Sequence, residues 1–196
     1  MVEVNIFYYS FSTFRTQRQE AETGCIYEWD GIKYLIDTTA VNYNAMTLDY
    51  VKHPGAISEM ACKYIKEKKP AFAALIYDNP DYPGHMYGFH TPEYYENLKV
   101  QDAYVGEIIA AIKEAGIYDD SIIIVTSDND GIETDHGGWD LNELETPFII
   151  AGKNVKKGGK FSENMMQYDV AATIAEIFAL DTPQVWTSKS MSQVFE

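Results

Sequence analysis

The feature that most constrains the fold of this chain is its alternation of short apolar runs with longer amphipathic segments. The apolar runs are of strand length and are continuous rather than alternating, which is typical of strands buried on both faces of a sheet. They cover residues 24–29, 71–77, 121–126 and 147–152. The run at 121–126 is rich in β-branched residues, so we expect it to be a central, fully buried strand.

Helical segments separate these runs. Residues 12–23 are polar and helix-like, 54–69 carry apolar residues at helical spacing, and a further helix is expected to close the chain at 169–178. Thr91 and Pro92 form an N-cap followed by proline in the first turn of another helix, which ends near Gly116. Strands alternating with helices predict an α/β fold with a largely parallel sheet flanked by helices on both faces.

Composition limits the class of protein. The 196 residues are 46% hydrophobic and 23% charged, which indicates a globular chain, and we expect one domain over 1–196. The net charge of −15 argues against a nucleic-acid surface. No apolar run approaches the roughly 18–20 residues of a membrane span. The first residues do not read as a signal peptide, so a cytoplasmic location is the default, and a periplasmic or secreted one is the alternative if sequence is missing upstream.

The functional crevice of such a fold lies beyond the carboxyl ends of its strands. The segment after the 71–77 run contains Asp81 and His85, four residues apart. Pro83 and Gly84 lie between them and predict a shaped turn rather than a regular helix. A carboxylate and an imidazole on one turn can converge on a zinc ion, which accepts both ligand types. An ordinary exposed turn is the alternative reading of this segment.

The segment after the 121–126 run contains Asp128 and Asn129, followed shortly by His136 between an aspartate and two glycines. A carboxylate at the end of a central strand is held rigidly, as a metal ligand requires. The segment is not an EF-hand loop, because the first and twelfth loop positions fall on Thr126 and Gly137, where Asp and Glu are required.

Taken in order, these motifs resemble the alkaline phosphatase superfamily, and within it the type I phosphodiesterase/nucleotide pyrophosphatase branch. The ordered motifs are Asp-x-x-Gly-His ending at His85, Ser-Asp-x-x-Gly ending at Gly131, and His-Gly-Gly beginning at His136. The resemblance extends from about Gly24 to the end of the chain, and includes the segments 28–31 and 145–152 and the helix that begins at Asp169.

The resemblance implies a site that holds two metal ions, usually zinc, which clamp a small phosphate-ester substrate. By motif, Asp81, His85 and His136 would bind one ion, and Asp128 and Asn129 would contribute to the other. Asn129 stands where the family has a histidine, and an amide oxygen is a poor zinc ligand. The family's first strand and its nucleophile segment have no counterpart here, so no catalytic nucleophile is assigned.

The expected function is therefore that of a metal-dependent hydrolase domain for phosphodiester or pyrophosphate substrates, impaired in this chain. One alternative is a non-catalytic remnant or metal-binding module, and another is a relative of the sulfatase or phosphomutase branch. A third is that the missing half is supplied by another polypeptide. A sheet that lacks a strand exposes an apolar edge, which also favours self-association.

Overall fold

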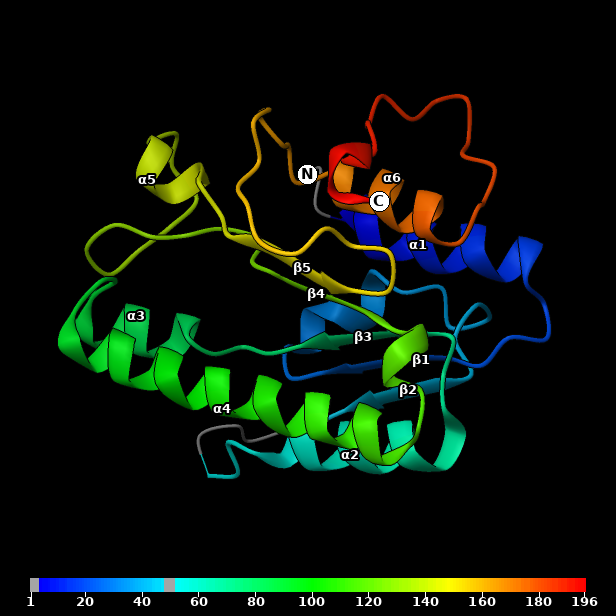
Figure 1. The fold of residues 1–196 in the computed structure, drawn as a ribbon. Coiled ribbons are helices and arrows are strands. Elements are labelled where there is room, and N and C mark those ends of the chain that lie inside the picture. The colour runs from blue at the N-terminus through cyan, green and yellow to red at the C-terminus, as the bar shows by residue number, and fades with distance from the viewer. Residues whose placement is uncertain (1–3, 48–51) are drawn as a thin grey trace.

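The computed structural model describes residues 4–47 and 52–196 (Figure 1). The strands are β1 (Thr23–Tyr27), β2 (Tyr43–Met46), β3 (Phe72–Ile76), β4 (Ile122–Thr126) and β5 (Phe148–Gly152). The helices are α1 (Val4–Gln17), α2 (Ala56–Lys68), α3 (Asp81–Tyr87), α4 (Pro92–Glu114), α5 (Leu141–Leu144) and α6 (Asp169–Ile177). Short 3₁₀ turns occur at Asp30–Tyr34, Tyr118–Asp120 and Ser192–Val194. Strands and helices alternate along much of the chain, which gives the predicted α/β class.

β1 is the middle strand of a three-stranded parallel sheet of order β2-β1-β3. Its residue Ile26 lies opposite Ala45 of β2 and Leu75 of β3. All five residues of β1 are buried, whereas those of β2 and β3 are mostly half-buried. Continuous burial on both faces explains why this segment carries an uninterrupted apolar run.

β4 and β5 form a separate antiparallel ribbon, in which Ile124 lies opposite Ile150. The prediction of a central, fully buried strand at 121–126 was therefore wrong. Within residues 4–47 and 52–196, β4 pairs only with β5, and its first four residues are half-buried. A strand with a neighbour on one side only keeps one edge exposed, whatever its own β-propensity.

Helices cover both faces of the parallel sheet, as predicted. On one face, Ile57, Ala61 and Tyr64 of α2 pack against Ile26 of β1, and α4 lies against α2 (Figure 1). On the other face, the ring of Phe11 from α1 stacks on that of Phe72, with centroids 4.4 Å apart. α6 lies alongside α1 on this second face (Figure 1).

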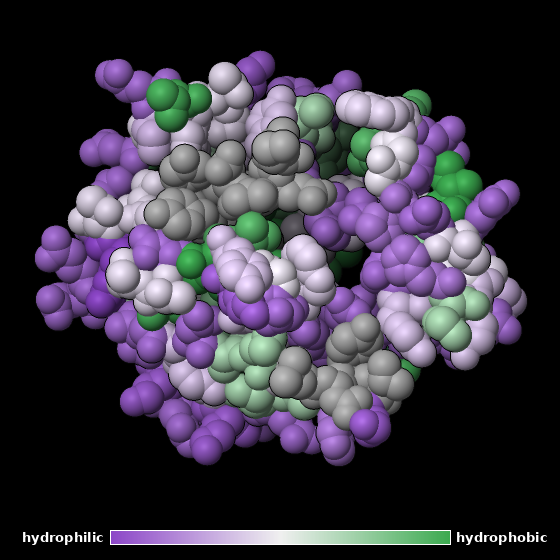
Figure 2. All heavy atoms as spheres, turned by 180° about the vertical axis from the view of Figure 1, so that it is seen from behind, coloured by the Kyte–Doolittle hydropathy of each residue, from purple (hydrophilic) through white to green (hydrophobic). Residues whose placement is uncertain are grey.

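The surface away from these contacts is largely hydrophilic. Figure 2, which views the molecule from behind, shows hydrophilic residues over most of this face, with hydrophobic residues both in the hollows and at several points of the outline. Exposed large hydrophobic side chains include Trp139 and Val185. In the part of the chain that the structure describes, no helix has both the length and the apolar character needed to cross a bilayer.

The segment that begins at Asp81 is a helix, α3, and not the shaped turn predicted from Pro83 and Gly84. Pro83 is the third helical residue, and the first-turn N–H groups of a helix have no acceptor within it, so a proline costs no hydrogen bond there. The cap residue that precedes the helix, Pro80, follows a cis peptide bond from Asn79. The helix is short and ends at Tyr87, directly before Gly88.

Candidate metal centre

The candidate site lies beyond the carboxyl ends of β3 and β4. α3 starts five residues after the end of β3, and the segment 127–138 follows β4 directly. The chain at and just after α3 contacts this segment: the N–H of Phe89 donates to the carbonyl oxygen of Glu133 at 2.7 Å, and His85 contacts Thr134. The polar side chains that follow β3 and those that follow β4 therefore lie close together.

Asp81, His85 and His136 form a cluster at this place. Oδ2 of Asp81 lies 3.4 Å from Nε2 of His85, and Oδ1 lies 3.2 Å from Nε2 of His136. One ligand atom from each of the three residues lies within 4.8 Å of the other two. The side chains are 32–41% exposed, so an ion from solvent can reach them. One carboxylate between two imidazoles is a donor set that zinc accepts.

A second contact fixes the orientation of the His85 ring. Its Nδ1 lies 2.7 Å from the carbonyl oxygen of Thr134. A carbonyl oxygen only accepts hydrogen bonds, so in the neutral ring the proton is on Nδ1 and the lone pair of Nε2 is directed toward Asp81. This is the arrangement that metal-binding histidines generally show, with the second ring nitrogen held by a carbonyl or carboxylate.

Phe89 packs against both histidine rings. It is 8% exposed, and its ring meets those of His85 and His136 nearly edge-on, with centroids 5.8 and 6.2 Å away. Two glycines make room for this ring, because a Cβ at Gly84 or Gly131 would lie 2.6 or 2.5 Å from it. Phe89 therefore fills the space between α3 and the segment after β4, and packs against two of the three residues of the cluster.

The electrostatics of the cluster favour a cation. Burial raises the pKa of the Asp81 carboxyl, the charges of His85 and His136 lower it, and those of Asp78 and Asp128 raise it again. Desolvation and neighbouring carboxylates both disfavour a negative charge that nothing balances. A bound divalent ion would offset both effects.

Asp128 and Asn129, predicted as ligands of a second ion, lie in the loop after β4 outside the three-residue cluster. The N–H of Asn129 donates to the carboxylate of Asp128 at 3.2 Å. The side chain of Gln167 donates to the carbonyl oxygens of Ser127 and Asp128, at 3.1 and 2.6 Å. These bonds hold the loop in place, and the role of Asp128 and Asn129 as ligands stays a prediction.

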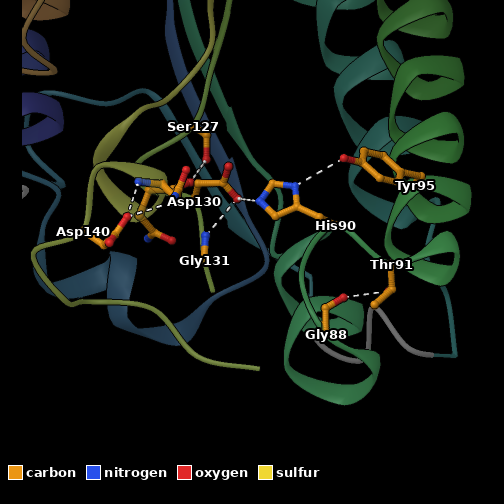
Figure 3. A network of polar contacts seen from close by, with 10 residues as sticks. Gly88, His90, Thr91, Tyr95, Ser127, Asp130, Gly131 and Asp140 are labelled. Atoms are coloured by element: carbon orange, nitrogen blue, oxygen red, sulfur yellow. Dashed lines mark hydrogen bonds and ion pairs between the residues drawn. The ribbon is translucent and has the colours of Figure 1, made fainter. Parts of the chain in front are cut away.

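The sequence reasoning missed a polar network that joins the two halves of the site (Figure 3). His90, between α3 and α4, lies with Nε2 3.4 Å from a carboxylate oxygen of Asp130, and its Nδ1 is 3.3 Å from the hydroxyl of Tyr95. The backbone of His90 has a φ of 62°, a conformation that non-glycine residues rarely adopt. No local spacing signals this network, because Asp130 and His90 are far apart in the sequence.

Comparisons with known proteins agree with the motifs. The sequence model of the family "Type I phosphodiesterase / nucleotide pyrophosphatase" matches residues 15–149, more than half of the chain. Bis(5'-adenosyl)-triphosphatase enpp4 of Mus musculus is 30% identical over 118 residues, which cover 58% of this chain and 25% of the relative. A 2,3-bisphosphoglycerate-independent phosphoglycerate mutase of Picosynechococcus is 28% identical over 147 residues, which cover 69% of this chain and 27% of the relative. The chain thus spans about a quarter of the length of these relatives.

Solved structures show the same fold. A 2-O GAG sulfatase superposes with a TM-score of 0.71 at 12% identity, over 93% of this chain and 55% of that one. A protein of the alkaline phosphatase superfamily from Vibrio parahaemolyticus superposes with a TM-score of 0.57 at 17% identity, over 91% and 51%. The fold is therefore that of part of an alkaline phosphatase-like domain. Together with the match over residues 15–149, these findings show that the chain belongs to the type I phosphodiesterase/nucleotide pyrophosphatase family.

Proposed function

We propose that this chain is the zinc-binding part of a hydrolase domain that acts on phosphodiester or pyrophosphate bonds. Its cluster of Asp81, His85 and His136 holds the ion. The observation that carries the proposal is that these three ligand atoms, from two separate strand ends, lie within 4.8 Å of one another. Their chemistry fits zinc, and the hydrogen bond from His85 to Thr134 already orients one imidazole for binding.

The substrate class follows from the family and from a relative. The mouse relative is named as a bis(5'-adenosyl)-triphosphatase, an enzyme for a substrate with phosphoric anhydride bonds. Zinc at the cluster would supply Lewis-acid polarisation of a phosphoryl oxygen. The chain's own contribution is positional, since Asp81 and the two imidazoles would hold the ion beyond the carboxyl ends of β3 and β4.

We further propose that hydrolysis by this chain alone is slow. No seryl or threonyl residue in the sequence matches the family's nucleophile motif, and Asn129 replaces a ligand histidine. Asp128 and Asn129 offer only oxygen donors, which suit harder ions better than zinc. The chain should therefore bind one zinc ion tightly rather than two.

Isothermal titration of the purified chain with Zn²⁺ tests the metal site. The proposal expects one tight site, and it expects His136→Ala to weaken that site by a large factor, because one of three protein ligands is lost. His53→Ala is the matched control, since His53 is exposed and outside the cluster. Equal titration curves for the wild type and His136→Ala would rule out the site.

Hydrolysis of bis(p-nitrophenyl) phosphate, with zinc or manganese present, tests the reaction class. A rate above the uncatalysed background that disappears in His136→Ala and survives in His53→Ala would assign the activity to this cluster. Zinc binding without any hydrolysis would leave a metal-binding module, the alternative that we set against an enzyme. Asn129→His that gains neither a second zinc ion nor activity would support this alternative.

A further inference from the structure

We propose that the carboxyl ends of β1 and β2 bind a hard divalent cation, such as calcium or magnesium, through the side chains of Glu28 and Thr47. Both residues are buried, with exposed fractions of 4% and 6%. Oε1 of Glu28 and Oγ1 of Thr47 nevertheless have no hydrogen-bond partner among the described residues. Buried polar atoms are almost always paired, so each of these two needs an explanation. The inference does not depend on the zinc site.

The pairing of the strands places Glu28 beside Thr47. Tyr27, the last residue of β1, lies opposite Met46, the last residue of β2. The N–H of Thr47 donates to the carbonyl oxygen of Tyr27 at 2.9 Å, so the parallel pairing continues to the end of both strands. Glu28 and Thr47 are therefore the next opposing pair, on backbones about 4.8 Å apart.

Both side chains lie on the face of the sheet that α2 covers. Ile26 of β1 and Ala45 of β2 belong to the apolar cluster formed with α2. Successive side chains of a strand alternate between the two faces, so Glu28 and Thr47, each two residues further on, share this face. The charge of Glu28 also acts on Tyr77, another residue of the same cluster. The two unpaired oxygens are therefore neighbours.

Other polar groups nearby are already engaged. The hydroxyl groups of Tyr77 and Ser58 are bonded to each other at 2.8 Å. The second carboxylate oxygen of Glu28 accepts a hydrogen bond from the N–H of Asp78 at 2.8 Å. One residue further on, Oδ1 of Asn79 is a third buried oxygen without a partner among the described residues. Carboxylate and amide oxygens only accept hydrogen bonds, so the missing partner is a donor or a cation.

The charges favour a cation. Burial raises the pKa of the Glu28 carboxyl, the N–H of Asp78 lowers it, and the charge of Asp78 raises it again. These influences include no lysine or arginine. A water molecule could donate to the open oxygens, but it would leave the charges of two neighbouring carboxylates unbalanced. A divalent ion balances both, and a buried charge that is balanced costs much less free energy.

The donor atoms select a hard ion. They are carboxylate, hydroxyl and amide oxygens, which suit calcium, magnesium or manganese rather than zinc. The zinc cluster differs, because two of its three ligands are imidazoles. Three side chains supply fewer oxygens than the roughly 6–8 that calcium takes, so water molecules would complete the shell. We therefore expect a weak site, with a dissociation constant of about 10⁻⁴–10⁻³ M.

Titration of Ca²⁺ and Mg²⁺ into the purified, chelator-treated chain tests the proposal, with urea unfolding and NMR as readouts. Each ion is added up to about 10 mM, above the roughly 10⁻³ M of the weakest calcium sites. An ion that binds only the folded chain raises the urea midpoint as its concentration increases. The amide signals of Glu28, Thr47 and Asp78 should shift along the same curve. Sodium chloride at equal ionic strength is the control for screening.

Glu28→Gln and Thr47→Val identify the ligands. Loss of a group that only orients a metal ligand costs about 10–100-fold in affinity, so loss of a ligand should weaken this site by at least about tenfold. Having both variants keeps the test valid if one fails to fold. Glu59→Gln is the matched control, because it removes a carboxylate from the exposed surface of α2. It should leave the titration unchanged, and so should His136→Ala, which alters only the zinc cluster.

Three results would overturn the proposal. One is that neither ion moves the urea midpoint or the three amide signals beyond the sodium chloride control, which would make a water molecule the bridging group. Another is an effect of the ions that both Glu28→Gln and Thr47→Val retain in full. The third is an effect that is lost in His136→Ala, which would place the ion in the zinc cluster instead.

Discussion

Replacing Phe89 with alanine should weaken zinc binding although Phe89 is not a ligand. The ring is 8% exposed and lies edge-on to the rings of both His85 and His136, at 5.8 and 6.2 Å. Its removal leaves a cavity between α3 and the segment after β4, and both imidazoles lose the surface that restricts their rotation. A ligand that must be ordered on binding costs conformational entropy, which reduces affinity.

The size of the effect can be bounded from the packing. Loss of a group that orients a metal ligand typically costs about 10–100-fold in affinity, which is about 1.4–2.7 kcal/mol at roughly 1.4 kcal/mol per tenfold. A buried Phe→Ala change also costs about 3–5 kcal/mol of unfolding free energy. We expect the lower end of that range here, because the ring lies under surface segments that can partly collapse. Zinc titration and urea unfolding measure the two effects.

Phe178→Ala is the matched control for this variant. Phe178 packs against Phe14 at 4.6 Å and against Phe72 at the amino end of β3, whereas the cluster lies beyond the carboxyl end of that strand. The control should lose stability and keep the zinc affinity of the wild type. The reasoning is refuted if Phe89→Ala binds zinc as the wild type does, or if both variants lose affinity equally.

Three further predictions concern stability, each measured by urea unfolding. Burial raises the pKa of Glu28 above its ordinary 4.5, so its charge opposes folding once the pH rises through the folded-state value. Glu28→Gln keeps an acceptor for the N–H of Asp78 and should stabilise the folded protein at pH 7, but not below pH 4.5. Equal gains in unfolding free energy at both pH values would contradict this. Gly131→Ala brings a Cβ to 2.5 Å from the Phe89 ring and should lower the free energy of unfolding by about 1–3 kcal/mol. Its control is Gly106→Ala in α4, where nothing lies within 4 Å of the added Cβ, and which should raise the free energy of unfolding by up to about 1 kcal/mol. Thr91→Ala removes the acceptor for the N–H of Tyr94 and a hydrogen bond to Gly88, so it should lower the free energy of unfolding by about 0.5–2 kcal/mol. An unchanged urea midpoint would show that this cap does not stabilise the protein.

Apolar periodicity predicted most elements of the fold, because their signals are local. The run at 71–77 contains β3, the run at 147–152 contains β5, and the helix expected after Thr91 is α4 with Thr91 as its N-cap. β2 was not predicted, since its four residues, Tyr-Asn-Ala-Met, include no β-branched residue. Its strand conformation comes from pairing with β1, which no local pattern reveals.

The errors have the same origin. The sequence of β4 is that of an interior strand, but burial depends on its neighbours, and among the described residues β5 is the one it pairs with. In α3, the general effect of proline on helices was overridden by the position of Pro83 in the first turn.

The site was accessible to sequence reasoning only in part. The spacing of Asp81 and His85 is visible within a short stretch of sequence, because the two residues are four positions apart. In α3 this spacing places them one above the other on one face of the helix. His136 was added by the order of the family motifs, since nothing local links it to α3. Phe89, Thr134 and the contact of His90 with Asp130 depend on how two strand ends meet, so only the structure reveals them.

The central claim is that Asp81, His85 and His136 hold one zinc ion. Zinc K-edge X-ray absorption of the chain, loaded with one equivalent of zinc, tests it most directly because the spectrum distinguishes imidazole from oxygen and sulfur ligands. The account predicts two imidazole nitrogens at about 2.0–2.1 Å, completed by oxygen ligands, and one imidazole fewer in His136→Ala. A wild-type spectrum with no imidazole, or one with a thiolate from Cys25 or Cys62, would contradict it.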